Sequence, residues 1–202
     1  RLYDWGTKSR PSAASAFIIG EAHRIKDGKL TVVALGALTN VASAIMEDPT
    51  IVPKIELHWL GSGYNFEKQT MSNLDFNSLM DMQALYVILN SPVELHIIPN
   101  NEASRMKMSW AETTDRFKGK HDLLDFILLR WFNHLDGGRD TRTIWDLALI
   151  EAIIHKDLST KMQVRTSKEK GDRDVWMYTE INDEKMREDF YRTTLDYLEK
   201  LK

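Results

Sequence analysis

Apolar runs of strand length alternate with stretches of helical periodicity through the first half of this chain. The expected strands are LTVVAL (30–35), KIELHWLG (54–61) and VELHIIP (93–99). The expected helices cover residues 12–26, 41–47 and 78–90. Because parallel strands need a crossover connection, this alternation predicts an α/β fold with a mostly parallel open sheet flanked by helices. The near-continuous apolar run at 30–35 is typical of a strand that is covered on both faces.

The second half of the chain is predicted to be mainly helical. Two apolar helices are expected at residues 121–138 and 143–157. The first of them carries a stripe made of Leu124, Ile127, Leu128, Trp131 and Leu135. Two antiparallel strands are expected around a turn at Gly171. The closing helix is expected to bury Met186, Phe190, Tyr197 and Leu201.

Composition limits the possible partners. A chain of 202 residues with 43% hydrophobic residues suits one domain or part of a larger one. A net charge of −3 gives no basic surface, so we expect no nucleic-acid partner. No apolar run approaches the length of a membrane span, so no membrane partner is expected. The chain has no cysteine for disulfides or thiolate metal sites, and its histidines show no His-x-x-x-His spacing, which argues against zinc.

Ligands of open α/β sheets gather beyond the carboxyl ends of the strands. Three segments qualify here: the small-residue turn 36–40, the loop 61–77 and the residues that follow the third strand. Asn40 is expected to cap the helix that follows the first turn. The loop 61–77 is far longer than the usual connection of about 2–6 residues. A functional loop and a simple surface insertion are both open readings of that length.

Four motifs, in order and spacing, resemble the inosine/uridine-preferring nucleoside hydrolase family. They are LTVVALGALTNVASAI, LHWLGSG, LDFN and IWDLALIEAI. The family carries at these places a strand ending in Gly-Pro-Leu-Thr-Asn, a Met-Gly-Gly strand end, a Glu-Phe-Asn loop and a His-Asp pair that opens a helix. The similarity covers roughly residues 12–155, and the Leu-Thr-Asn turn is its most specific element. The resemblance implies a single nucleoside-hydrolase-like domain over residues 1–202.

The resemblance also implies a reaction and a cofactor. A water activated by Ca²⁺ would cleave the N-glycosidic bond of a ribonucleoside to give ribose and free base. The carbonyl of Thr39 and the carboxylate of Asp146 would be calcium ligands, since Ca²⁺ prefers hard oxygen donors. Taken without the resemblance, Thr39 is an ordinary strand-to-helix turn residue and Asp146 an ordinary acid at a helix N-terminus.

Four further residues would contact the substrate by the same resemblance. Asn77 matches the ribose-binding Asn, and Asp75 occupies the position of the Glu that binds the 5′-hydroxyl. Gln69 falls where an Asn usually helps at that hydroxyl, and Leu60 stands at the Met of Met-Gly-Gly. Asn and Asp also populate loops for turn chemistry, so structural roles for these residues stay open.

Two departures from the family pattern concern catalysis. Trp145 stands where many members have the His that protonates the leaving base, and an indole cannot act as a general acid. Trp145 could instead stack on a nucleobase or pack in the core. The family's Asp-x-Asp-x-x-x-Asp-Asp loop, which supplies the general base and the main calcium carboxylates, has no match: Asp4 is isolated, and Asp172 and Asp174 fall in the late hairpin.

Two hypotheses follow. In the first, the chain is the C-terminal two-thirds of a nucleoside hydrolase, an incomplete domain whose first strand and Asp-rich loop lie on a missing segment or a second polypeptide. This chain alone would then be inactive, and no catalytic residue is assigned to it. In the second, the protein is a non-catalytic relative that binds ribosides or serves in assembly. We expect an exposed sheet edge or apolar face, and a homo-oligomer or association with the N-terminal segment.

Overall fold

The computed structural model describes residues 8–201, so Asp4 lies outside the described residues. The chain divides into two compact units. Unit 1 combines residues 1–102 and 160–180, and unit 2 combines residues 103–159 and 181–202. The chain therefore leaves unit 1 after residue 102, returns to it for two late strands, and leaves it again after residue 180. No helix within 8–201 has both the length and the apolar character needed to cross a membrane.

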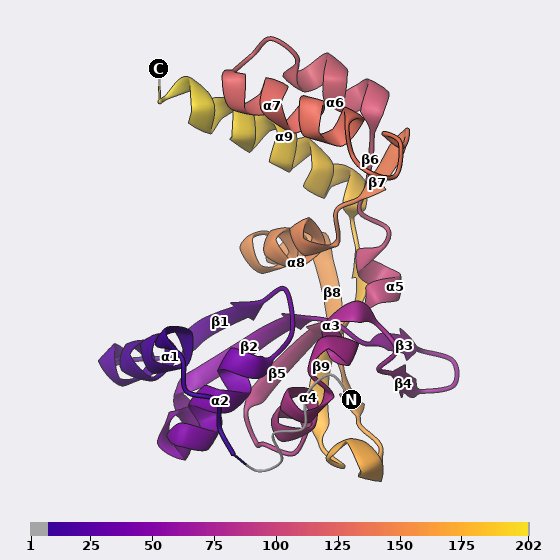
Figure 1. Cartoon of the computed structure of the whole chain (residues 1–202). Helices are drawn as coiled ribbons and strands as arrows, with labels where there is room; N and C mark the ends of the chain where they lie inside the picture. Colours follow the sequence, from indigo (N-terminus) through magenta and orange to yellow (C-terminus); the bar gives the residue numbers. More distant parts are fainter. Residues whose placement is uncertain (1–7, 202) are drawn as a thin grey trace. The chain divides into compact units, whose positions relative to one another are not determined.

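A five-stranded sheet organises unit 1 (Figure 1). In spatial order its strands are β1 (Leu30–Ala34), β2 (Ile55–Leu60), β5 (Glu94–Ile98), β9 (Asp174–Ile181) and β8 (Ser159–Arg165). β1, β2, β5 and β9 run parallel to one another. β8 and β9 form a hairpin closed by the Thr166 N–H, which donates to the Arg173 carbonyl at 2.9 Å. The predicted α/β fold with a mostly parallel sheet is confirmed.

Apart from α1, which precedes β1, the helices of unit 1 lie in the connections between strands. They are α1 (Ala13–Arg24), α2 (Thr39–Glu47), α3 (Phe76–Met80), α4 (Met82–Leu89) and α5 (Asn100–Ala103), with the short 3₁₀ turns η1 (Pro49–Lys54) and η3 (Lys168–Lys170). α1 begins at a capping box made by Ser12 and Ser15. α1, α2 and α4 pack on one face of the sheet, over buried side chains such as Leu57, Trp59 and Ile97. That core fixes the strand ends on which the site depends.

The first strand differs from its prediction. The side chains of β1 alternate between half-buried and exposed, and Val33 is 38% exposed. Helices cover the face of Val32, whereas Thr31 and Val33 point to the other face, so the prediction of two covered faces is wrong. β1 is also an edge strand of the sheet. That this edge pairs with a further segment stays a prediction.

Two helix predictions in unit 1 are also wrong. The N-cap of α2 is Leu38, and Asn40 lies inside the first turn, where its side chain accepts from Ser12 Oγ at 3.1 Å. The single helix predicted for 78–90 is two helices separated at Asp81. The Asp81 carboxylate accepts from the Ala84 N–H at 3.0 Å and so caps α4, with its own backbone outside the helical region.

The loop predicted at 61–77 contains regular structure. Strands β3 (Gly63–Asn65) and β4 (Thr70–Ser72) pair as an antiparallel hairpin. The turn between them is held by the Lys68 N–H, which donates to Asn65 Oδ1 at 2.8 Å, and by Gln69 in the left-handed region at φ 51°. The connection is therefore long because it contains a small β-hairpin.

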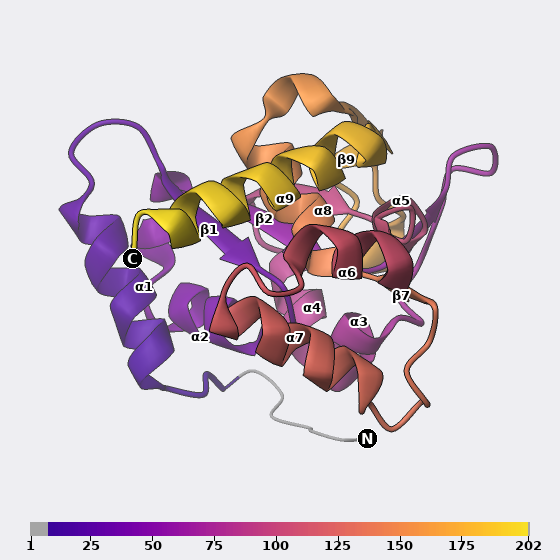
Figure 2. The same ribbon diagram turned by 90° about the horizontal axis from the view of Figure 1, so that it is seen from above.

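Unit 2 is mainly helical, as predicted. Its elements are β6 (Lys107–Ser109), α6 (Trp110–Phe117), α7 (Asp122–Phe132), β7 (Thr141–Thr143), α8 (Trp145–Ile154), the 3₁₀ turn η2 (Lys156–Leu158) and α9 (Asp183–Glu199). α6, α7 and α9 lie side by side (Figures 1 and 2) and share a core that includes Phe117, Leu128 and Tyr191. The Tyr191 hydroxyl hydrogen-bonds Thr113 Oγ1 at 2.8 Å, which satisfies both buried groups.

Four predicted core positions of unit 2 are exposed. α7 ends at Phe132, so Leu135 lies beyond it and is fully exposed, and Ile127 is 41% exposed. Near the end of α9, Tyr197 and Leu201 are each 61% exposed. The buried stripe of α9 instead runs through Met186, Tyr191 and Leu198. The predictions for Ile127 and Tyr197 are wrong because the helices present a different face to their neighbours, and those for Leu135 and Leu201 because the helices end before these residues.

Candidate functional site

Asn77 ties together the carboxyl ends of two neighbouring parallel strands. Its side-chain Nδ2 donates to the carbonyl of Leu60, the last residue of β2, at 2.9 Å. It also donates to the carbonyl of Leu35, just after β1, at 3.2 Å. The leucine side chain of Leu60 itself is buried. The structure thus brings Asn77 and Leu60 together at the carboxyl ends of the strands, where the sequence analysis predicts that a ligand binds.

Asp75 holds the loop that follows β2. Its Oδ2 accepts from the Ser62 N–H at 2.8 Å and from the Ser78 hydroxyl, and its Oδ1 accepts from the Ser78 N–H at 3.1 Å. Asp75 is thereby the N-cap of α3. Ser62 is buried with φ 59°, and its hydroxyl donates to Asn73 Oδ1 at 3.1 Å. The carboxylate of Asp75 therefore has a structural use already.

The buried side chain of Trp59 contacts the residues that follow β1 and β2. The Trp59 Nε1–H donates to the Gly36 carbonyl at 3.0 Å, across the ends of β2 and β1. A Cβ built on Gly61 would lie 2.0 Å from the Trp59 ring, so only glycine fits there. Gly36 has open space around it, so packing does not require a glycine there. Both strand ends are fixed by one indole.

Thr39 lies at the same end of the sheet, as the first residue of α2. Its Oγ1 donates to Asp81 Oδ2 at 2.5 Å, which links the start of α2 to the cap of α4. As a first-turn helix residue, Thr39 gives one lone pair of its carbonyl to the α2 ladder and keeps a second. Since a helix carbonyl points along the helix axis, the use of this oxygen as a metal ligand stays a prediction.

Gln69 lies apart from these residues. It is exposed at the tip of the β3–β4 hairpin, where it lines a small cavity of about 120 Å³ with Tyr64, Met71, Arg165 and Lys170. Neither Asp75 nor Asn77 lines that cavity. The structure does not bring Gln69 to the strand-end cluster.

Trp145 and Asp146 belong to unit 2 and open α8. Trp145 is 45% exposed, so it is not a core residue. Asp146 is an exposed residue, and the partial burial of its carboxyl raises its pKa above the ordinary value. A carboxylate whose charged form is disfavoured in this way gains from a cation placed beside it.

The chemistry of Thr39 and Asp146 fits calcium, because a carbonyl and a carboxylate are both hard oxygen donors. Ca²⁺ takes about 6–8 oxygen ligands, so two residues fill only part of its sphere. Within residues 8–201, two clusters of acids and histidines could hold a metal ion, and neither contains Asp75 or Asp146. Thr39 belongs to unit 1 and Asp146 to unit 2, so each is described here by itself and their joint role as calcium ligands stays a prediction.

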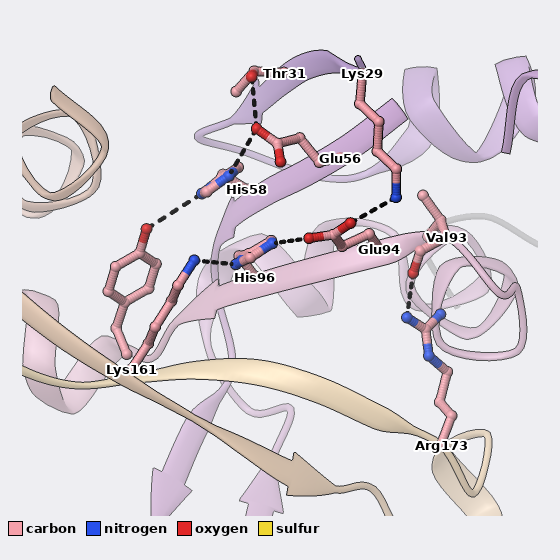
Figure 3. A network of polar contacts seen from close by, with 10 residues as sticks. Lys29, Thr31, Glu56, His58, Val93, Glu94, His96, Lys161 and Arg173 are labelled. Carbon is pink, nitrogen blue, oxygen red and sulfur yellow. Dashed lines mark hydrogen bonds and ion pairs between the residues drawn. The ribbon is translucent and has the colours of Figure 1, made fainter. Parts of the chain in front are cut away.

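A polar network that the sequence reading missed crosses one face of the sheet (Figure 3). Parallel pairing places Glu56 beside Glu94 and His58 beside His96. The two imidazole rings stack at 4.3 Å with an angle of 5° between their planes. The signal was present, since both strands contain Glu-Leu-His, at 56–58 and 94–96, in the same register.

Lysines complete this network. Lys29 Nζ donates to Glu94 Oε2 at 2.7 Å, and the His96 Nε2 donates to Glu94 Oε1 at 2.9 Å. Lys161 Nζ donates to His96 Nδ1 at 2.9 Å, which fits a neutral His96. The bond from Lys29, followed by that from His96, lowers the pKa of Glu94 to about 2. Burial, followed by the charge of His96, lowers the pKa of His58 to about 4.

A larger pocket lies at the opposite end of the strands. It has a volume of about 620 Å³ and is lined by residues around the start of β5, including Val93, Glu94, Arg173 and Trp176. The Arg173 guanidinium donates there to the carbonyls of Ser91 and Val93. Arg173 thus joins the β8–β9 hairpin to the start of β5, which is a structural contact rather than a ligand site at the predicted edge.

The fold resembles that of solved nucleoside hydrolases. The structure matches an inosine-uridine preferring nucleoside hydrolase from Bacillus anthracis with a TM-score of 0.68 and 19% identity, over 92% of this chain and 66% of that chain. It also matches the type III effector protein XopQ, solved in complex with adenosine diphosphate ribose, with a TM-score of 0.63 and 13% identity, over 87% of this chain and 62% of that chain. These likenesses define a nucleoside-hydrolase fold.

Sequence similarity extends this to the family. The chain is 33% identical over 90 residues to a pyrimidine-specific ribonucleoside hydrolase, RihB, of Escherichia coli, a match that covers 44% of this chain and 28% of that relative. The sequence profile described as inosine-uridine preferring nucleoside hydrolase matches residues 2–188. The chain belongs to this family, and it spans only about a third of the length of the curated relatives it matches.

Proposed function

We propose that the protein hydrolyses the N-glycosidic bond of ribonucleosides to ribose and free base. One observation carries the proposal: Asn77, at the family's ribose-binding position, is clamped by the carbonyls that end β1 and β2. These two bonds use the N–H groups of the Asn77 amide. Its Oδ1 is an acceptor and can therefore bind a further donor. A ribose hydroxyl would donate to that oxygen at the carboxyl edge of the sheet, where such folds bind ligands.

The other predicted contacts act around Asn77 in this proposal. Asp75 fixes the loop that carries Asn77, and its carboxylate has lone pairs left for the 5′-hydroxyl. Leu60 contributes the wall beneath the sugar, and Gln69 remains a proposed contact from the hairpin. Trp145, which is 45% exposed, would stack on the nucleobase.

The proposal includes Ca²⁺, with the Thr39 carbonyl and the Asp146 carboxylate among its ligands. Bound there, the ion would supply a more acidic water and would grip the ribose hydroxyls. Thr39 holds its carbonyl in place through the start of α2 and its bond to Asp81. A bound cation would stabilise the ionised carboxylate of Asp146 and so lower its raised pKa.

The remaining calcium ligands and the general base are proposed to come from an Asp-rich loop outside these residues. In this proposal residues 1–202 form an incomplete single domain, and the chain alone is inactive. The exposed edge at β1 would then pair with that N-terminal segment or with a second copy of the chain.

Two measurements test the proposal. Kinetics with inosine, uridine and p-nitrophenyl riboside should show turnover for a protein that carries an Asp-rich loop. The substitution Asn77→Ala should abolish this turnover. Calorimetry on the same protein should show Ca²⁺ binding that Asp146→Asn weakens. A protein with the loop that binds no Ca²⁺ and releases no base contradicts the proposal.

A second candidate is a non-catalytic protein that binds ribosides or serves in assembly. The specific observation behind it is Trp145, which replaces a general acid by an exposed indole. Calorimetry with uridine and inosine distinguishes the two. Binding with an intact N-glycosidic bond after long incubation favours this candidate, and turnover rejects it.

A further inference from the structure

Three side chains from two helices of unit 2 converge in a cluster that contains none of the residues assigned to the proposed nucleoside site. They are Glu151 of α8, His155, which caps the end of α8, and Asp189 of α9. Each offers one ligand atom, and the three atoms lie within 4.8 Å of one another. His155 Nε2 lies 3.0 Å from Asp189 Oδ2 and 3.8 Å from Glu151 Oε2.

One oxygen of this cluster has no partner. The Glu151 side chain is only 6% exposed, and its Oε2 accepts no hydrogen bond from any of the residues 8–201. Burying a carboxylate oxygen without a partner is unfavourable, and proteins compensate it with a proton, a cation or a metal. Burial, followed by the charge of Asp189, raises the pKa of Glu151. The orphaned oxygen faces the imidazole and therefore points into the cluster.

The other members are held in position by their surroundings. Asp189 Oδ1 accepts from the Arg192 guanidinium, and Asp189 Oδ2 accepts from Thr193 Oγ1 at 3.2 Å as well as from His155. Burial opposes ionisation of Asp189, but the bonds from Arg192, His155 and Thr193 outweigh it and lower the pKa of Asp189. The cluster therefore presents an ionised carboxylate and an imidazole whose Nε2 points between two acids.

We propose that Glu151, His155 and Asp189 bind a divalent first-row transition-metal ion, with Zn²⁺ as its probe. One imidazole nitrogen and two carboxylate oxygens are the donors that such ions accept. Ligands about 2.0 Å from a tetrahedral ion lie about 3.3 Å from one another. The observed separations of 3.0 and 3.8 Å bracket that value. The ion would replace the proton shared by His155 and Asp189 and would give Glu151 Oε2 its missing partner.

The spacing explains why a search for paired histidines passes over this site. Glu151 and His155 are four residues apart at the end of one helix, so their side chains lie on the same face. The third ligand comes from another helix, 34 residues further along the chain than His155. Three protein ligands leave the remaining coordination position to water.

The second acid–histidine cluster provides a matched comparison. Glu56, His58 and His96 also lie within 4.8 Å, but the two imidazole rings stack face to face at 4.3 Å and 5°. Lone pairs in the planes of two parallel rings run parallel and do not converge on one ion. His58 is therefore the control position.

Isothermal titration of the metal-free 202-residue chain with Zn²⁺ tests the proposal. We expect one ion per chain, and an affinity reduced at least about tenfold by Glu151→Gln and by Asp189→Asn, since even the partners of metal ligands change affinity 10–100-fold. His58→Gln should leave the affinity unchanged. Saturating Zn²⁺ at about a hundredfold excess over Kd should raise Tm by roughly 5–10 °C in the parent chain.

Folding of the variants is checked separately. Glu151→Gln should be at least as stable as the parent in EDTA, because the amide carries no buried charge, and should lose the Zn²⁺-induced rise in Tm. His155→Gln serves as a further variant should Glu151→Gln fold poorly. Absence of Zn²⁺ binding overturns the proposal, as does binding that Glu151→Gln and His155→Gln leave intact or that His58→Gln removes.

Discussion

Replacing Asn77 by alanine isolates the clamp between the ends of β1 and β2. The substitution removes two hydrogen bonds donated by one amide, at 2.9 Å to the Leu60 carbonyl and at 3.2 Å to the Leu35 carbonyl. Leu60 is buried, whereas Leu35 is 37% exposed. Water can therefore replace the second bond more easily than the first.

The expected loss of stability follows from these two bonds. A net hydrogen bond contributes about 1 kcal/mol, and we count the bond at Leu60 fully and the exposed one at about half. Asn77→Ala should thus lower the free energy of unfolding by about 1.5 kcal/mol. For a chain of this size that corresponds to a Tm lower by roughly 3–6 °C.

Urea denaturation followed by circular dichroism measures this difference. Asn90→Ala is the matched control, since Asn90 Nδ2 also donates to a carbonyl, that of Tyr86 at 2.8 Å, but within one exposed helix end. Its effect should stay within about 0.5 kcal/mol. Asn77→Asp should be worse than Asn77→Ala at pH 7, because a carboxylate would face two carbonyl oxygens.

The reasoning is refuted if Asn77→Ala and Asn90→Ala prove equally stable. It is also refuted if Asn77→Asp is no less stable than Asn77→Ala, because the side chain would then not point at the two carbonyls. In either case Asn77 would not be fixed at the strand ends, and its proposed contact with ribose would lose its structural basis.

Three further substitutions probe the same unit. Gly61→Ala should destabilise by about 3 kcal/mol or more in urea titrations, because its Cβ would lie 2.0 Å from the buried ring of Trp59. Asp81→Ala should lower the free energy of unfolding by about 1–2 kcal/mol through loss of the α4 cap, read out by Tm. Because the pKa of His58 falls from 6.5 to about 4 on folding, the unfolded chain binds the proton first as pH drops. Stability should therefore decrease by roughly 1–3 kcal/mol between pH 6.5 and 4, and His58→Gln should flatten that slope in denaturation curves at several pH values.

The strands were predictable because their signal is local. The expected strands at 30–35, 54–61 and 93–99 each lie within one or two residues of the observed β1, β2 and β5. The first is a near-continuous apolar run, and the other two alternate apolar residues with Glu and His, both of which are typical of short strands bounded by turn residues. The parallel order of the sheet followed from the helices between them.

The wrong predictions concern helix ends, which depend on capping side chains, and buried faces, which depend on the neighbouring helices. Asp81 ends one helix and begins another through a single carboxylate, although the apolar periodicity runs straight through it. Ile127 and Tyr197 fit helical stripes, yet their exposure depends on which face meets a partner helix, and that information is not local. The same holds for the 61–77 hairpin, whose turn depends on Asn65 and Gln69 rather than on a Gly-rich pair.

Some features of the candidate site could be predicted from the sequence, and others depend on contacts that only the structure shows. The resemblance pointed to Asn77 and Thr39, and the structure shows both at the carboxyl edge of the sheet. It could not show that Asp75 is an N-cap, because a cap and a ligand need the same residue type. Cross-strand and cross-helix clusters, such as His58 with His96, are visible only after register is known.

The position of β9 has a consequence for how the chain is made. β9 lies between β5 and β8, although it is the last strand to be synthesised. The 75 residues 99–173 separate the end of β5 from the start of β9. At 5–20 residues per second, the ribosome needs about 4–15 s to produce them. During that time β5 lacks its neighbour, so nascent chains stalled before residue 174 should recruit chaperones or mispair along β5.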